Sequence, residues 1–127
     1  MTVIEGAVAI SILLICVLGV INLFPWSLQV SKSAELKTLA TNLAQEKIEE
    51  LIALDYEEVS VGTIESRHSL ESPFSNYQRE TTVNYVDTNL DDNGSDQGMK
   101  KIMVIVYWSS QISGDSQIQI NTLISQL

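Results

Sequence analysis

The hydrophobic and polar positions divide this chain into three parts: an apolar run, a segment in which apolar residues recur every three or four positions, and a segment in which they alternate with polar residues. Residues 6–25 form a largely apolar run, and no Asp, Glu, Lys, Arg or His occurs from Gly6 through Ser31. About twenty such positions make roughly 30 Å of helix, which matches the thickness of a bilayer core. Between residues 27 and 55, aliphatic residues recur at intervals of three and four, which predicts an amphipathic helix. These aliphatic residues are Leu36, Leu39, Leu43, Ile48, Leu51 and Ile52.

The apolar and amphipathic segments are expected to form one long helix, because neither Gly nor Pro occurs between Trp26 and Leu54. Pro25 lies inside it. A proline cannot donate to the carbonyl four residues earlier, so the pattern predicts a kink or local melting over residues 19–25. Gly19 and Asn22 weaken the same stretch. A single kinked anchor helix and a helix whose freed carbonyls are satisfied by neighbouring helices both fit this pattern.

The second half of the chain changes to a period of two. Residues 79–86 and 100–108 are rich in β-branched and aromatic residues, and residues 116–124 alternate Ile and Thr with polar residues. Segments rich in Asp, Asn, Gly and Ser join them, so we expect an antiparallel meander. Residues 59–76 are expected to be a loop, with a short strand at residues 59–64 as the only candidate element.

An apolar sheet face needs a cover, and the aliphatic stripe of the amphipathic helix is the available one. The predicted fold class is therefore α+β, with a long kinked N-terminal helix packed on an antiparallel sheet of three to four strands. We divide the chain into a hydrophobic helix at 1–26, an amphipathic half of the helix at 27–55 and a globular β-sheet domain at 56–127.

The charge distribution and the rare reactive residues narrow the classes of function to consider. The formal net charge is −9, and every charged side chain except Glu5 follows Ser31. Such an acidic surface repels phosphate backbones, so the lone subunit is not expected to bind nucleic acid. Cys16 is the only cysteine and is interpreted as a small apolar residue. His68, the only histidine, is expected in an exposed loop. We find no catalytic set and expect neither an enzyme nor a cofactor.

The N-terminal segment does not have the pattern of a cleavable secretory signal. No basic residue precedes the apolar run, and the residues that follow it are bulky rather than small. On the chain as given, the positive-inside rule places Lys32 and Lys37 in the cytoplasm. A basic leader removed before Met1 would reverse this orientation.

The stretch MTVIEGAVAISILL resembles the mature N-terminus of type IV pilins and of the pseudopilins of type II secretion. The family pattern is an aromatic residue or Met, then Thr, two aliphatic residues and Glu, and the matching positions are Met1, Thr2, Val3, Ile4 and Glu5. Pro25 with the preceding Gly19 is similar to the family's helix-melting region. A long helix followed by an antiparallel sheet is also the family's architecture. Identity at the level of motifs is confined to about the first 25 residues.

This resemblance implies an assembly role for Glu5 and Met1. A carboxylate at the edge of hydrocarbon is costly unless it is paired. In the family, Glu5 would meet the terminal amine, usually methylated, of Met1 in an adjoining subunit. The alternative is that Glu5 only stabilises the positive end of the helix dipole. The resemblance also implies that a prepilin peptidase cuts a short leader before Met1 and methylates the new amine.

The function implied is that of a structural subunit of a type IV pilus-like filament. The chain would be inserted in the cytoplasmic membrane, handed to the pilus assembly machinery and polymerised with copies of itself into an extracellular filament. One alternative is a minor pilin or pseudopilin of a secretion or DNA-uptake system. A second is a single-pass anchor that holds an adhesion module at the cell surface.

Two features depart from the family. Many pilins close a C-terminal loop with a disulfide, which a single cysteine cannot form within one chain. Many pseudopilins bind calcium near the sheet, and the acidic segment 87–98 offers weak candidates for such a site. Its spacing is not that of a regular calcium loop, so a solvated acidic turn is the other interpretation. The candidates are Asp87, Asp91, Asp92 and Asp96.

Overall fold

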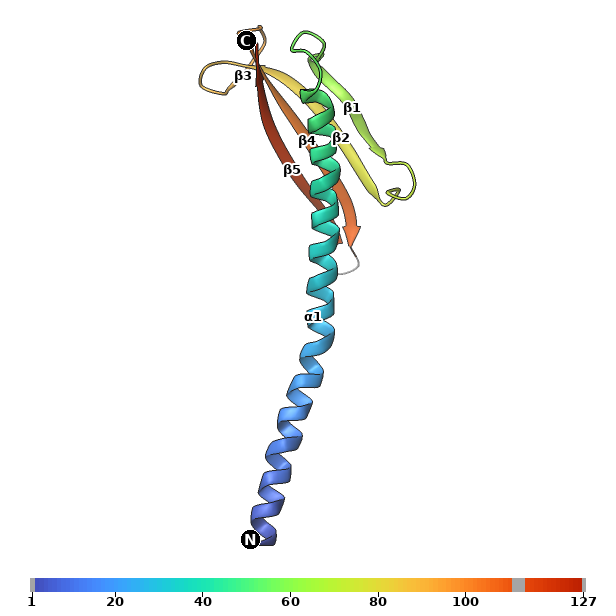
Figure 1. Ribbon diagram of the computed structural model, residues 1–127, viewed down its shortest axis with the longest axis vertical. Helices are drawn as coiled ribbons and strands as arrows, with labels where there is room; N and C mark the ends of the chain where they lie inside the picture. The colour runs from blue at the N-terminus through green and yellow to red at the C-terminus, as the bar shows by residue number, and fades with distance from the viewer. Residues whose placement is uncertain (1, 111–113, 127) are drawn as a thin grey trace. The chain divides into compact units, whose positions relative to one another are not determined.

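The computed structural model describes residues 2–110 and 114–126. In this part of the chain one helix is followed by five strands (Figure 1). The chain divides into two compact units, Met1–Glu35 and Leu36–Leu127. The elements are α1 (Val3–Ile52), β1 (Gly62–Ser69), β2 (Tyr77–Val86), β3 (Asp92–Asn93), β4 (Met99–Ser110) and β5 (Gly114–Ser125).

The five strands form one antiparallel sheet in the order β1-β2-β4-β5, and the two-residue β3 pairs with the end of β2. The ladder between β4 and β5 is unbroken, from Met99 opposite Ser125 to Ser110 opposite Gly114. The ladder between β1 and β2 has two register shifts, on either side of Glu65. The sheet therefore has one regular edge, at β5, and one irregular edge, at β1.

The α+β fold class is confirmed, as are the three strands that the alternating pattern predicts. The prediction of a loop over residues 59–76 is wrong, because β1 occupies eight residues of it. Only Gly62 and Glu65 of β1 are partly buried, and its other residues are exposed, so the strand lacks the alternation that predicted the other strands. The sheet has five strands rather than three to four. His68 is exposed as expected, but it lies in β1 and not in a loop.

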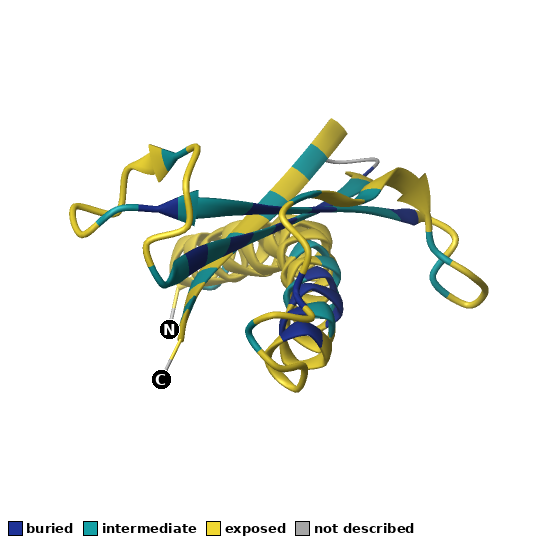
Figure 2. Cartoon of the chain, turned by 90° about the horizontal axis from the view of Figure 1, so that it is seen from above, coloured by how far each residue is buried: buried dark blue, intermediate teal, exposed yellow. Residues whose placement is uncertain are grey.

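The C-terminal part of α1 packs on one face of the sheet. The buried positions of the helix face the buried centre of the strands (Figure 2). Ile102, Val104 and Val106 of β4 are all 0% exposed, and each contributes about 1.5–3 kcal/mol by burial. The buried helix residues are Ala40, Leu43, Ala44, Ile48 and Leu51.

The helix stripe differs from the predicted one at both small and large residues. Ala40 and Ala44 are 0% exposed, although the sequence pattern did not select them. Small residues at these positions let the helix backbone approach the sheet closely. Ile52 was expected in the core but is 50% exposed, because α1 ends at this residue.

The turn after α1 is fixed by a lysine of the sheet. Lys100 is only 3% exposed, and its Nζ donates to the carbonyl oxygens of Tyr56 at 2.7 Å and Val59 at 2.8 Å. The same ammonium lies 4.0 Å from the centre of the Tyr56 ring. Val59 is 1% exposed, so it belongs to the core without being part of a strand. The predicted short strand at residues 59–64 therefore begins later, at Gly62.

The N-terminal part of α1 is helical without a break through Pro25. Local melting over residues 19–25 is therefore absent from this state of the chain; the kink, and melting during assembly, stay predictions. Proline has a helix-compatible φ and removes only one donor, so the neighbouring turns continue. The Asn22 side-chain amide donates to the carbonyl of Leu18 at 2.8 Å, one turn earlier in the same helix.

Candidate functional site

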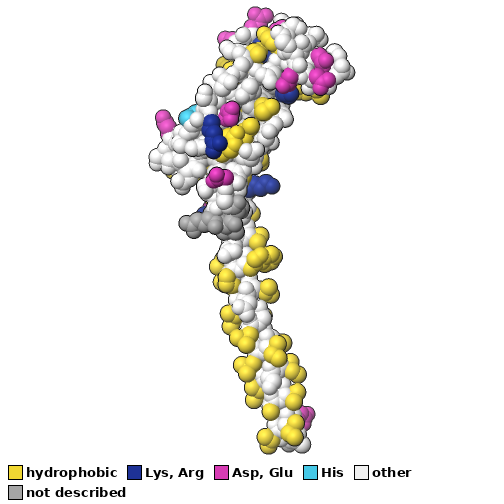
Figure 3. Space-filling model, turned by 180° about the vertical axis from the view of Figure 1, so that it is seen from behind, with side chains coloured by type: hydrophobic (Ala, Val, Ile, Leu, Met, Phe, Trp, Pro, Cys, Tyr) yellow, Lys and Arg dark blue, Asp and Glu magenta, His cyan; other side chains and the backbone are white. Residues whose placement is uncertain are grey.

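The N-terminal part of α1 presents an apolar surface on all sides. Every Val, Ile, Leu, Phe and Trp between Val3 and Val30 is exposed, from 46% at Val17 to 91% at Val3. Figure 3 shows these side chains along the segment. A stretch of 18 residues in α1 has a mean hydropathy of 2.8, and none of these residues is buried. The helix α1 is therefore a candidate membrane span. Such a surface requires lipid or other apolar chains around it.

The first turn of this helix is capped by Thr2. The backbone N–H of Glu5 donates to Thr2 Oγ1 at 3.3 Å, and the N–H of Gly6 donates to the Thr2 carbonyl at 3.2 Å. Thr2 is thus the N-cap and Glu5 the third helical residue, which is the spacing of a capping box. Our sequence analysis missed the role of Thr2, although the pattern Thr-x-x-Glu could have shown it.

Glu5 is exposed at the start of the apolar surface. Its place in the first turn fits the alternative in which it stabilises the helix N-terminus alone. Met1, the predicted partner in a neighbouring chain, lies outside the described residues. The pairing between chains therefore stays a prediction.

The remaining predicted residues of the N-terminal half lie on the same exposed surface. A Cβ added at Gly19 would meet no atom within 4 Å, so packing within the chain does not require glycine there. Cys16 is exposed and has no disulfide partner. Packing within the described part of the chain therefore explains neither the glycine at position 19 nor the cysteine at position 16.

The acidic segment 87–98 is a set of separate hydrogen-bonded turns. One oxygen of Asp87 accepts from the N–H groups of Asn89 at 2.8 Å and Asp91 at 3.1 Å. Asp92 pairs with Lys101, and the hydrogen bond from this lysine lowers the pKa of the Asp92 carboxyl. These contacts hold the loop by its own side chains.

Asp96 has a different role. It accepts hydrogen bonds from the Tyr56 hydroxyl at 2.6 Å and from the Gly98 N–H at 2.8 Å, and the bond from Tyr56 lowers its pKa. No group of three Asp, Glu, His or Cys that could hold a metal occurs within residues 2–110 and 114–126. The calcium candidates are thus not brought together, and the acidic-turn interpretation is the one that the geometry favours.

A polar cluster that the sequence did not reveal lies between the helix and strands β1 and β2. Arg79 donates to both carboxylate oxygens of Glu65, from Nε at 2.9 Å and from Nη2 at 3.1 Å, and Thr81 Oγ1 donates to the same carboxylate at 3.0 Å. Arg79 also donates to the carbonyl of Leu43 on the helix at 3.3 Å. Burial alone would raise the pKa of Glu65, but the bonds from Arg79 and Thr81 outweigh it and lower this pKa. The cluster ties the helix to the irregular edge.

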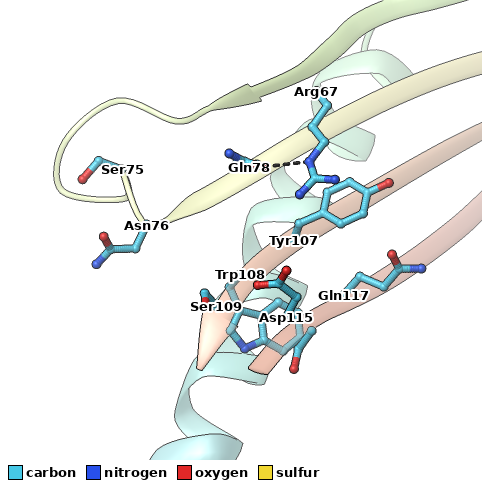
Figure 4. A pocket seen from close by; sticks show the side chains of 10 residues that line it. Arg67, Ser75, Asn76, Gln78, Tyr107, Trp108, Ser109, Asp115 and Gln117 are labelled. Carbon is cyan, nitrogen blue, oxygen red and sulfur yellow. Dashed lines mark hydrogen bonds between the residues drawn. The ribbon is translucent and has the colours of Figure 1, made fainter. Parts of the chain in front are cut away.

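One end of the sheet carries a polar pocket of about 440 Å³, shown in Figure 4. Arg67 donates to the Gln78 side-chain oxygen at 2.7 Å, and its guanidinium lies 4.0 Å from the centre of the Tyr107 ring. Trp108 and Asp115 complete the wall. The side chains that line the pocket are mostly polar, so this arrangement suits hydrogen bonding to a polar ligand.

No protein-family model, curated protein or solved structure matches this chain.

Proposed function

We propose that this protein is a structural subunit of a type IV pilus-like extracellular filament. The observation that carries the proposal is the wholly exposed apolar half of α1, joined to a folded acidic sheet domain. An apolar surface of this length is unstable in water, whereas a bilayer or a bundle of identical helices can cover it. The resemblance of residues 1–5 to mature pilins selects the bundle as the final state.

Assembly then moves the apolar segment from lipid to protein. The chain is held in the cytoplasmic membrane by α1, is processed before Met1 by a prepilin peptidase and is polymerised by the pilus assembly machinery. Glu5 pairs with the amine of Met1 in the neighbouring subunit. A carboxylate at the edge of the hydrocarbon is costly unless it is paired, by less than the cost of about 3 kcal/mol at the membrane centre, so the pairing favours one register between subunits.

The two roles of Glu5 can be separated by one substitution. Glu5→Gln keeps a side chain that completes a capping box but removes the negative charge. If Glu5 pairs with an amine, this variant inserts into the membrane normally and yields no filaments. If Glu5 acts on its own helix alone, Gln loses only the charge–dipole contribution of about 0.3–1 kcal/mol and still supports assembly. Glu49→Gln is the matched control, since Glu49 is an exposed glutamate on the polar side of the helix.

Filament yield is measured by electron microscopy of material sheared from cells, and insertion by membrane fractionation. Mass spectrometry of the N-terminus tests processing and methylation. Normal filaments from both Glu5→Gln and Glu5→Ala would refute the pairing mechanism. Trace abundance in sheared material would favour a minor pilin or pseudopilin instead.

A single-pass anchor carrying a binding module is the second candidate, and the polar pocket at the end of the sheet is the observation that favours it. In that case Glu5 is replaceable, and crosslinking in cells recovers monomers rather than a ladder of oligomers.

A further inference from the structure

Strand β5 is a long and regular strand at the edge of the sheet. Its twelve residues pair with β4 without any register shift, and within the described residues β4 is the only strand that it pairs with. The opposite edge of β5 thus presents a row of backbone N–H and C=O groups to solvent. Such an edge is a template for another extended chain unless the protein protects it.

The two edges of the sheet differ in protection. At the β1 edge the ladder shifts register twice, and the strand carries Glu65, Arg67 and His68. Bulges and charges are the usual means by which proteins prevent edge-to-edge pairing. At the β5 edge, residues 117–125 contain no charged side chain and no proline, in a chain whose formal net charge is −9. The β5 edge therefore lacks the protection against strand pairing that the β1 edge has.

The two faces of β5 have distinct and consistent chemistry. Ile118, Ile120 and Ile124 point to the helix-covered side and pack against the core, yet they remain only partly buried. On the outer side, the Gln119 amide donates to the Asn121 side-chain oxygen at 3.1 Å, and both amides keep further donors and acceptors. The same outer side also carries Leu123, which is 46% exposed. A strand that adds to this edge must offer apolar residues on the helix-covered face and uncharged, mostly hydrogen-bonding residues on the outer face.

We propose that the partner strand is β5 of a second copy of this chain. An antiparallel pair keeps its faces matched only when residues of the same parity meet, so a two-fold pair is centred on a residue. The uncharged run 117–125 is centred on Asn121. Around this centre, Ile118 meets Ile124 of the second copy and no like charges face each other within the run. Two sheets then become one continuous sheet, and the half-exposed isoleucines gain cover.

This contact is separate from the filament core. A two-fold antiparallel pair reverses the direction of the second chain, whereas neighbours in a polar filament point the same way. Chains held in one membrane by α1 also point the same way, so in cells the pairing joins subunits of different filaments, and this setting rests on the proposed function. The contact itself is defined by the β5 edge alone, and its test on the detergent-solubilised chain needs no filament.

Site-directed disulfide formation tests the pairing in the full chain in detergent micelles. Directly opposite residues of an antiparallel pair have Cα atoms about 4.5–5.5 Å apart, within the range that a disulfide spans. In a Cys16→Ser background, Asn121→Cys is expected to give a disulfide-linked dimer. Ser66→Cys, at the exposed middle of the β1 edge, is the matched control and is expected to give several-fold less. Equal yields at the two positions, or none at Asn121, would overturn the proposal.

Charge exchange supplies a second, independent test. Like charges opposite each other destabilise a strand pair, and opposite charges stabilise it. Asn121→Lys alone and Asn121→Glu alone are expected to lower the dimer fraction several-fold, and mixing the two variants is expected to restore it. Because Asn121 is exposed, neither substitution disturbs the core. If the mixture stays monomeric, or if Asn121→Cys crosslinks in cells to a different protein, self-pairing is wrong.

Discussion

Replacing Glu65 should destabilise the sheet domain more than the replacement of any exposed acid. The Glu65 side chain is 13% exposed and that of Arg79 is 14% exposed, and three hydrogen bonds reach the Glu65 carboxylate. Glu65→Ala leaves a largely buried guanidinium with only its bond to the Leu43 carbonyl, and it leaves the Thr81 hydroxyl, 0% exposed, without this acceptor.

The expected loss in the free energy of unfolding follows from the cost of removing one partner of a buried ion pair. That cost is about 3–5 kcal/mol, and the residual exposure of both partners places this pair near the lower end, at about 3 kcal/mol. For a domain of this size, 1 kcal/mol shifts Tm by about 4–8 °C, so Glu65→Ala should lower Tm by roughly 12–24 °C. Glu65→Gln keeps one acceptor and should lose about half as much free energy.

The assay is thermal and urea unfolding of the full chain in detergent micelles, followed by near-ultraviolet circular dichroism. Glu50→Gln is the matched control, because Glu50 is 62% exposed in its pair with Lys47 and should lose less than about 1 kcal/mol. The reasoning is refuted if Glu65→Ala unfolds within about 0.5 kcal/mol of the unsubstituted protein, which is below the smallest loss expected for an uncompensated buried charge.

Stability should also depend on pH through the same group. The native pKa of Glu65 lies below its unfolded value of 4.5, so its contribution is complete above pH 4.5. As the pH falls below 4.5 toward the lowered native pKa, the carboxylate is protonated and the contribution is lost. Glu65→Gln should therefore flatten the fall of Tm in this acidic window, and an unchanged slope would contradict the assignment.

Three further predictions concern the core and the turn after α1. Lys100→Met removes the donor to the Tyr56 and Val59 carbonyls and should lower the free energy of unfolding by about 1–3 kcal/mol, visible as a lower urea midpoint with an unchanged slope. Val104→Ala deletes buried methyl groups at 0% exposure and should cost about 2 kcal/mol by the same measurement. Burial and the hydrogen bond to Asp96 raise the pKa of Tyr56 to about 12, so an alkaline absorbance titration should show a component near 12 that Tyr56→Phe abolishes.

The secondary structure was predictable where the periodicity was strong. Strands β2 and β4 and the helix stripe have a buried face and β5 has a partly buried one, and burial imposes the alternation that the sequence displays. The short strand expected at residues 59–64 overlaps β1 only at residues 62–64, and the rest of β1 was missed because an exposed edge strand has no such constraint. Ala40 and Ala44 were missed because alanine carries little hydrophobic signal, although a close helix–sheet approach depends on it.

The functional features likewise divide into those that the sequence could predict and those that it could not. The cap formed by Thr2 and the exposed apolar helix are local features, so their residues are adjacent in the sequence. In the sequence, Glu65 lies 14 residues before Arg79 and 16 residues before Thr81. Only the shifted register of β1 against β2 brings their side chains together. The polar pocket likewise joins residues from four strands and a loop.

The sequence by itself determined that much of the first part of the chain must be covered by lipid or by other chains, because the residues after the helix are too few to bury an apolar helix of this length. It also determined that the rest is an acidic α+β domain. Only the tertiary structure decided which polar side chains pair beneath the helix and which edge of the sheet stays open. Both depend on strand order and register, and the same alternating pattern is compatible with several of these.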